Sequence, residues 1–276
     1  MGILYIVSTP IGNLEDITLR ALRILREVVL IAAEDTRHTR HLLTHFDIHT
    51  PVTSYFEHNK LQKIEQIRSA LERGDVALVS DAGTPTINDP GYELVRFAVE
   101  QGITVCPIPG PSSPIAALSA SGLPASAFIF LGYLPRKTKE IQKLLAERRL
   151  EQAVMVFLES PNRIRESLTI IAAELPDRRL VLAREITKKF EQFLRGTAGQ
   201  ILMELPEKPL GEMVLLLEGC GQREELPITM EEALNQIAPL LANGIRVKDA
   251  VLQVAASGNI NKKELYAAAT KLFTEK

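Results

Sequence analysis

Short apolar runs alternate with segments of helical period along the first 120 residues. We expect strands at residues 3–7, 28–33, 76–79 and 103–106, and helices at 17–26, 36–45, 61–73 and after Gly91. Strands that alternate with helices are typical of a parallel sheet covered on both faces. The proline-rich segment 107–111 predicts a break in regular structure, and Ser112, Ser113 and Pro114 can then cap and begin another helix.

A second series of elements follows. Strands are expected at 128–131, 154–158, 180–183, 192–194 and 213–217, and helices at 137–149, after Pro161 and from Thr197. This pattern indicates a second α/β domain with mixed strand directions. After a linker at 219–222, Thr229 and Glu232 form a capping-box pattern that opens the first of three helices. We therefore expect two α/β domains at 1–122 and 123–221, and a C-terminal helical module at 222–276.

The composition of the chain limits the classes of function that the protein can have. A net charge of −2 over 276 residues excludes a uniformly basic nucleic-acid binder, so any RNA contact must be concentrated on one face. No apolar run approaches the roughly 18 residues of a membrane span, and the first strand leaves no room for a signal peptide. Cys106 and Cys220 lie far apart and form no metal-type pair. These features predict a cytoplasmic protein with reduced cysteines, no bound metal and no membrane contact.

The loop from Asp81 to Gly91 follows the apolar strand at 76–79. In open α/β sheets, ligands bind at the carboxyl ends of the strands. Gly83 lets backbone approach a ligand, Pro85 and Pro90 stiffen the loop, and Asp81 offers an acceptor to hydroxyls or amines. On these residues alone, the loop is either a small-molecule cradle or an ordinary turn.

The first strand leads into another strand-to-helix loop, residues 8–16, in which Gly12 is the only glycine. A dinucleotide site needs G-x-G-x-x-G and a P-loop needs G-K-[ST], so that phosphates can sit on bare amides. Neither pattern is present in this loop. Phosphate binding there is disfavoured.

Glu34 and Asp35 end the second strand. Three interpretations stay open: they could hold the ribose hydroxyls of a nicotinamide cofactor, orient or deprotonate an attacking hydroxyl, or cap the next helix. On that helix Arg37, His41 and His45 share a face, which favours a solvated basic surface, able to touch phosphate, over a metal site. A second basic cluster is either a solvated face or part of an RNA footprint, and contains Arg136, Lys137, Lys139, Lys143, Arg148 and Arg149.

Taken in order, these motifs resemble a known family, the tetrapyrrole-methylase-like (class III) methyltransferases, and most closely its small-subunit ribosomal RNA methyltransferase I branch. The resemblance spans nearly the whole chain. It is carried by segments 9–18, 32–37, 80–85 with 88–91, 109–111, 132–135, 159–160, 183–185 with 187–188, and 211–214.

The resemblance implies two α/β domains of the tetrapyrrole methylase type with a cofactor cleft between them. It also implies S-adenosylmethionine as cofactor, a homodimer, and methylation of a cytidine ribose 2′-hydroxyl in the decoding region of 16S rRNA, within the small ribosomal subunit. Position by position, the cofactor-binding residues would be Pro10, Gly12, Asp81, Ala82, Gly83, Ser112, Ser113, Leu158, Ala183 and Met213.

For catalysis, we expect Glu34 or Asp35 to orient or deprotonate the hydroxyl and Arg37 to position RNA phosphate. The chain departs from the family pattern at Asn162, where a histidine is common, and asparagine cannot carry a proton. Two alternatives remain: a tetrapyrrole-type small-molecule C-methyltransferase and a non-catalytic RNA binder in ribosome assembly. The first is disfavoured by the glycine-poor first loop and the lysine-bearing helical tail.

Overall fold

The computed structural model describes residues 1–55, 60–220, 229–257 and 260–273. The chain forms two compact units, Met1–Gly219 and Cys220–Lys276. Within the described residues, every helix is too short or too polar to cross a membrane.

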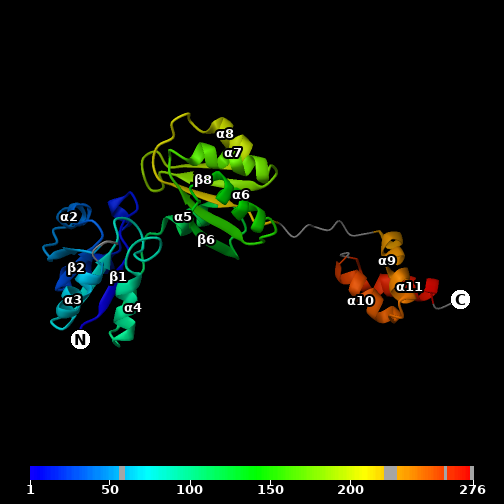
Figure 1. Cartoon of the computed structure of the whole chain (residues 1–276), viewed down its shortest axis with the longest axis horizontal. Helices are drawn as coiled ribbons and strands as arrows, with labels where there is room; N and C mark the ends of the chain where they lie inside the picture. Colours follow the sequence, from blue (N-terminus) through cyan, green and yellow to red (C-terminus); the bar gives the residue numbers. More distant parts are fainter. Residues whose placement is uncertain (56–59, 221–228, 258–259, 274–276) are drawn as a thin grey trace. The chain divides into compact units, whose positions relative to one another are not determined.

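The first sheet of the larger unit carries the labels β1 and β2 in Figure 1. It is parallel throughout, in the order β3-β2-β4-β1-β5. Its strands are β1 (Leu4–Val7), β2 (Leu30–Ala33), β3 (Val52–Ser54), β4 (Val76–Val79) and β5 (Val105–Ile108). Because side chains alternate across a strand, β1 buries Val7 under one pair of helices and Leu4 and Ile6 under the other. The first pair is α1 (Leu19–Glu27) and α2 (Thr36–His45), preceded by the 3₁₀ turn Leu14–Asp16, and the second is α3 (Lys60–Leu71) and α4 (Tyr92–Glu100). The predicted parallel sheet is confirmed.

Two local features of this sheet differ from what the sequence predicts. No strand is expected from the sequence at β3, which is only three residues long and lies at an edge. The predicted break at 107–111 is wrong at its start, because β5 continues through Pro107 to Ile108. β5 pairs with β1 alone. An edge strand tolerates proline because its missing N–H can face away from the ladder.

The second sheet has the order β6-β7-β10-β8-β9. β6 and β7 are parallel and the other three pairs are antiparallel, which confirms the mixed directions. Its strands are β6 (Phe128–Tyr133), β7 (Val154–Glu159), β8 (Arg179–Arg184), β9 (Gln192–Thr197) and β10 (Met213–Leu217).

Helices cover both faces of this sheet. One face packs against α6 (Thr138–Glu147), α7 (Ile164–Glu174) and α8 (Ala198–Glu204). The opposite face packs against α5 (Ser113–Ser121), which buries Ala117 and Leu118 on β7, β8 and β10. α5 therefore joins the layer of the second sheet, although it precedes residue 122 in the chain. The predicted domain boundaries themselves stay predictions.

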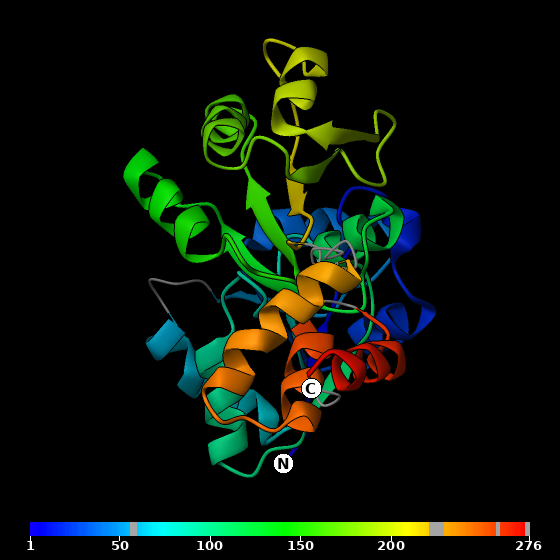
Figure 2. The same cartoon turned by 90° about the vertical axis from the view of Figure 1, so that its right-hand side faces the viewer.

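The C-terminal unit contains α9 (Met230–Ala242), α10 (Val247–Ser257) and α11 (Lys262–Phe273), drawn in orange to red in Figure 2. They enclose a small core that includes Ala233, Ile237 and Leu265. Both bonds of the predicted capping box form: the Glu232 N–H donates to the Thr229 hydroxyl (3.2 Å), and the Thr229 N–H donates to Glu232 Oε2 (2.9 Å).

Candidate functional site

A cavity of about 290 Å³ lies inside the larger unit, where strand ends and loops of both sheets meet. From the first sheet's side it is lined by Ile11, Glu34, residues 81–84, residues 87–89, and residues 112–114. From the second sheet's side it is lined by Phe130, Tyr133, residues 158–161, Glu185, Ile186, Lys188, and residues 212–214. Six of these described lining residues are acidic, and Lys188 is the one basic residue among them.

The ends of β2 and β4 brace each other at the floor of this cavity. The backbone N–H of Asp81 donates to Glu34 Oε2 (3.3 Å), and the backbone N–H of Asp35 donates to Asp81 Oδ1 (3.0 Å). Each strand end thus holds a carboxylate of its neighbour. The two bonds fix the Glu34 and Asp81 side chains in place.

Two carboxyl groups in the cavity have raised pKa values. Burial raises the pKa of Glu34 above its ordinary value, the Asp81 N–H offsets part of the effect, and the nearby charge of Asp89 adds to it. Burial likewise raises the pKa of Asp89, and the nearby charges of Asp81 and Glu212 add to that effect. A raised pKa makes a carboxylate a stronger base, so Glu34 and Asp89 can accept protons more readily than surface acids.

Asp35 and Arg37 have a different environment. Asp35 is the N-cap of α2 and accepts from the Arg37 backbone N–H (2.8 Å). The Arg37 guanidinium pairs with the same carboxylate (2.7 Å) and holds the pKa of Asp35 well below its usual range. Neither residue lines the cavity. The capping interpretation of Asp35 is therefore confirmed, and a carboxylate stabilised in this way is a weak proton acceptor.

The 81–91 loop is tied to its surroundings. Thr9 and Gly83 exchange backbone hydrogen bonds (2.9 and 3.0 Å), and the Thr84 hydroxyl contacts the Ser8 hydroxyl (3.0 Å) and the Pro111 carbonyl (3.2 Å). Gly83 (φ 85°) and Asn88 (φ 70°) are left-handed, which is uncommon for asparagine. These contacts hold the loop open as a wall of the cavity.

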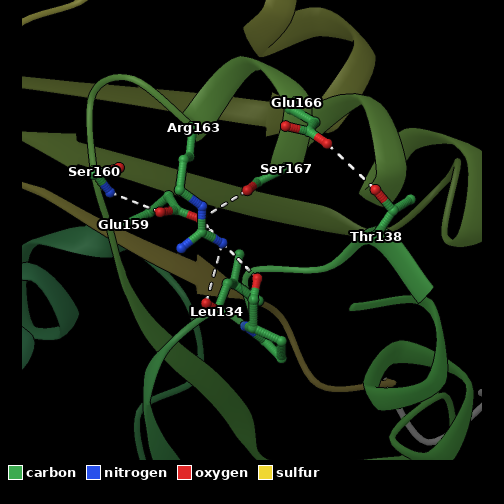
Figure 3. A network of polar contacts seen from close by, with 8 residues as sticks. Leu134, Thr138, Glu159, Ser160, Arg163, Glu166 and Ser167 are labelled. Carbon is green, nitrogen blue, oxygen red and sulfur yellow. Dashed lines mark hydrogen bonds and ion pairs between the residues drawn. The ribbon is translucent and has the colours of Figure 1, made fainter. Parts of the chain in front are cut away.

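A buried network builds the opposite wall (Figure 3). The Glu159 side chain is fully buried at the end of β7, where it accepts from the Ser160 N–H and the Ser167 hydroxyl (both 2.7 Å) and pairs with Arg163 (3.3 Å). Arg163 also donates to the Leu134 carbonyl (3.1 Å) and to the Pro135 carbonyl. The network therefore locks the segment after β6 to the start of α7, and it holds in place Glu159 and Ser160, which line the cavity.

The residues expected from sequence fall into two groups. The lining includes Glu34, Asp81, Ala82, Gly83, Ser112, Ser113, Leu158 and Met213. Outside it lie Pro10, Gly12, Asp35, Arg37 and Ala183. Gly12 packs beside a lining residue, since a Cβ there would lie 2.7 Å from Lys188 Cγ. Ala183 is fully buried among residues that pack against α5.

Sequence reasoning missed several lining residues, among them Asn88, Asp89, Tyr133, Glu159, Glu185, Lys188 and Glu212. All of them belong to the motifs that carried the family resemblance. The motifs thus contain all of these residues, but the residues carried over by position from the family did not include them.

Comparison with known proteins defines the family. A family model described as Tetrapyrrole (Corrin/Porphyrin) Methylases matches residues 3–202. Proteins named ribosomal RNA small subunit methyltransferase I are 44% identical over 96% of this chain in Halalkalibacterium halodurans and 46% identical over 96% in Escherichia coli O157:H7. In both cases 93% of the relative is covered. The chain belongs to the tetrapyrrole methylase family, in its ribosomal RNA small subunit methyltransferase I branch.

This tetrapyrrole methylase family assignment confirms the resemblance read from the motifs. Solved structures agree at the level of fold. Uroporphyrin-III-C-methyltransferase from Thermus thermophilus superposes with a TM-score of 0.53 at 21% identity, covering 78% of this chain and 94% of that one. Diphthine synthase superposes with a TM-score of 0.59 at 19% identity, covering 79% and 90%. The two α/β sheets seen here are thus the tetrapyrrole methylase architecture.

Proposed function

We propose that this protein uses S-adenosylmethionine to methylate the ribose 2′-hydroxyl of a cytidine in the decoding region of 16S rRNA. The observation that carries the proposal is full-length similarity, at 41–46% identity, to proteins named ribosomal RNA small subunit methyltransferase I. The acidic cavity between strand ends of both sheets supports it as the place of reaction.

The residues around the cavity fit the proposed cofactor. S-adenosylmethionine has a cationic sulfonium and a cationic ammonium group, and six acidic residues surround the cavity. Ile11, Ile186 and Val214 provide apolar surface for an adenine ring. The left-handed Gly83 lets main chain approach a ligand closely. When bound, this cofactor supplies an electrophilic methyl group.

Asp81 and the start of α5 would hold the cofactor. Asp81 Oδ1 is already engaged by the Asp35 N–H, so Asp81 is held in one orientation. Ser112 is the N-cap of α5 but makes no side-chain cap bond, and both Ser112 and Ser113 line the cavity. A helix N-terminus favours negative charge. We assign the two serines to the cofactor's carboxylate and Asp81 to one of its cationic groups.

Glu34 is the group best suited to receive the proton of the ribose hydroxyl. It lines the cavity, its side chain is fixed by the Asp81 N–H, and burial raises its pKa. Asp35 is partly exposed, lies outside the cavity lining and is neutralised by Arg37. Asp35 therefore serves to cap α2, and the exposed Arg37 guanidinium would have to contact an RNA phosphate while it is paired with Asp35 or by leaving it.

The remaining parts of the proposal concern the partners. We infer that the substrate is presented within the small ribosomal subunit, in the cytoplasm, and that the enzyme acts as a homodimer. Clustered basic residues such as Arg136, Lys137 and Lys139 give the otherwise acidic chain a local surface for RNA.

The proposal is tested by supplying methyl-labelled S-adenosylmethionine with isolated 30S particles, naked 16S rRNA or a porphyrin precursor in parallel. Label in RNA is the expected result. Label in the precursor alone would make the protein a small-molecule C-methyltransferase. RNA binding without any transfer would make it an assembly factor.

A further inference from the structure

The loop between β8 and β9, residues 185–191, is a built structure with an exposed aromatic residue near its end. The Lys188 N–H donates to the Glu185 carbonyl (3.0 Å), the Glu191 N–H donates to the Lys188 carbonyl (3.1 Å), and the Thr187 N–H donates to a Glu191 carboxylate oxygen (2.7 Å). Ile186 is buried. These bonds present Phe190 to solvent, with 68% of the residue exposed.

The same loop forms part of the cavity wall. Glu185, Ile186 and Lys188 line the cavity, and the Lys188 ammonium pairs with Glu185 (3.0 Å). Phe190 is two residues beyond Lys188. Phe190 itself lies outside the lining, but two exposed large apolar side chains, Ile87 at 50% and Tyr133 at 56%, belong to it. Exposed apolar surface therefore gathers around this site.

Positive charge accompanies the aromatic ring. The Lys189 ammonium lies 5.6 Å from the centroid of the Phe190 ring, over its face. Lysine is attracted both to such a ring and to phosphate, whereas a buried protein interface rarely retains a lysine. An aromatic ring beside a lysine is the combination that proteins use to stack an unpaired base and to contact its backbone.

We propose that Phe190 is a stacking platform for an unpaired RNA base that neighbours the nucleotide bound in the cavity, and that Lys189 contacts the adjoining phosphate. This inference rests on the proposed function, because an RNA substrate provides the base. A nucleotide extruded into a cleft leaves its neighbours unstacked, and an exposed ring replaces the lost stacking. Phe190 acts in binding and takes no part in the chemistry.

A fluorescence experiment tests stacking without relying on catalysis. The chain contains no tryptophan, so F190W introduces a single reporter. Titration with a single-stranded ten-nucleotide cytidine RNA should quench this fluorescence and displace Lys189. The matched control is F128W, because Phe128 is also an exposed phenylalanine (42%). It lies at the start of β6 and is not part of the cavity lining, which this strand reaches at its other end, at Tyr133. Equal quenching in both variants, or none in F190W, would overturn the inference.

Kinetics give the second measurement. F190A should raise the KM for 30S particles about tenfold, leave the KM for S-adenosylmethionine unchanged, and be rescued by F190W. F128A should behave as wild type. Wild-type kinetics of F190A would overturn stacking while the methyltransferase function stands. If the wild-type protein itself transfers no methyl to RNA, the proposed function fails, and the fluorescence titration still decides the stacking.

Light scattering tests the competing explanation, that Phe190 belongs to a contact between subunits. F190A and wild type should have the same mass in solution. Conversion of a dimer to a monomer by F190A would assign the ring to a subunit contact and overturn the inference.

Discussion

At the scale of single residues, two adjacent carboxylates at one strand end have opposite properties. Glu34 is half-buried beside Asp89 and has a raised pKa, whereas Asp35 is paired with Arg37 and has a lowered one. The sequence places both at the end of a strand and cannot separate them, because burial and pairing depend on loops that are distant in the chain. The difference supports the proposal that Glu34 takes the proton, whereas Asp35 caps α2.

Substitution of each carboxylate separates these roles. Glu34→Gln keeps an oxygen for the Asp81 N–H but cannot take a proton, so single-turnover methyl transfer should slow by about 10²–10³-fold. Asp35→Asn keeps a good N-cap and should stay within a few-fold of wild type. Single-turnover rates with 30S particles at saturating cofactor measure both. A slow Asp35→Asn protein beside a fast Glu34→Gln protein would reverse the assignment.

The raised pKa of Glu34 also predicts a stability effect. Because the folded state binds this proton more tightly than the unfolded state, ionisation of Glu34 destabilises the fold as pH rises through and above the ordinary carboxyl pKa. Glu34→Gln should therefore be more stable than wild type in urea at pH 7, and this difference should vanish near about pH 4. A Glu34→Gln protein that is less stable at pH 7 would contradict the described environment of Glu34.

At the scale of elements, the two walls of the cavity touch at Gly132 in β6. A Cβ at this left-handed glycine (φ 69°) would lie 2.7 Å from Asn88 Oδ1 in the 81–91 loop. Gly122 is also left-handed (φ 78°), but nothing lies within 4 Å of its Cβ position. A comparison of Gly132 with Gly122 therefore separates the effect of backbone strain from the effect of the contact with Asn88.

Gly132→Ala and Gly122→Ala should each lower the free energy of unfolding by about 1–2 kcal/mol through left-handed strain. Only Gly132→Ala should also weaken cofactor binding, about tenfold, because it displaces Asn88 from the cavity wall. Urea unfolding and calorimetric titration with S-adenosylmethionine measure the two effects. Equal cofactor affinity in both variants would show that the Asn88 contact does not shape the site.

Most elements were predictable because their signals are local. The strand at 76–79, the helix at 36–45 and the Thr229 capping box all appear as predicted. The differences have non-local causes: Pro107 fits a strand only because β5 is an edge, and α5 packs on a sheet whose strands come later in the chain. For the same reason, the strand-end rule pointed to Asp81, whereas only the tertiary structure shows that Lys188 lines the same cavity.

At the scale of the whole molecule, the chain divides at Gly219–Cys220 into two units, each with its own core. Every described residue that lines the cavity belongs to the first unit. Binding of the cofactor should therefore not require the second unit.

A protein ending at Gly219 should fold cooperatively and bind S-adenosylmethionine within about twofold of the full chain, since no lining residue is lost. Circular dichroism and calorimetric titration test this. Loss of cofactor binding in a folded 1–219 protein would show that the C-terminal helices complete the site.

The central claim is that this cavity methylates a ribose in small-subunit RNA. The direct measurement incubates the wild-type protein with 30S particles and methyl-labelled S-adenosylmethionine, digests the RNA to nucleosides, and identifies the labelled product by mass spectrometry. We predict label in 2′-O-methylcytidine, and its near absence with Glu34→Gln. Label on a base carbon or nitrogen, or none in RNA while a tetrapyrrole precursor is methylated, would contradict the claim.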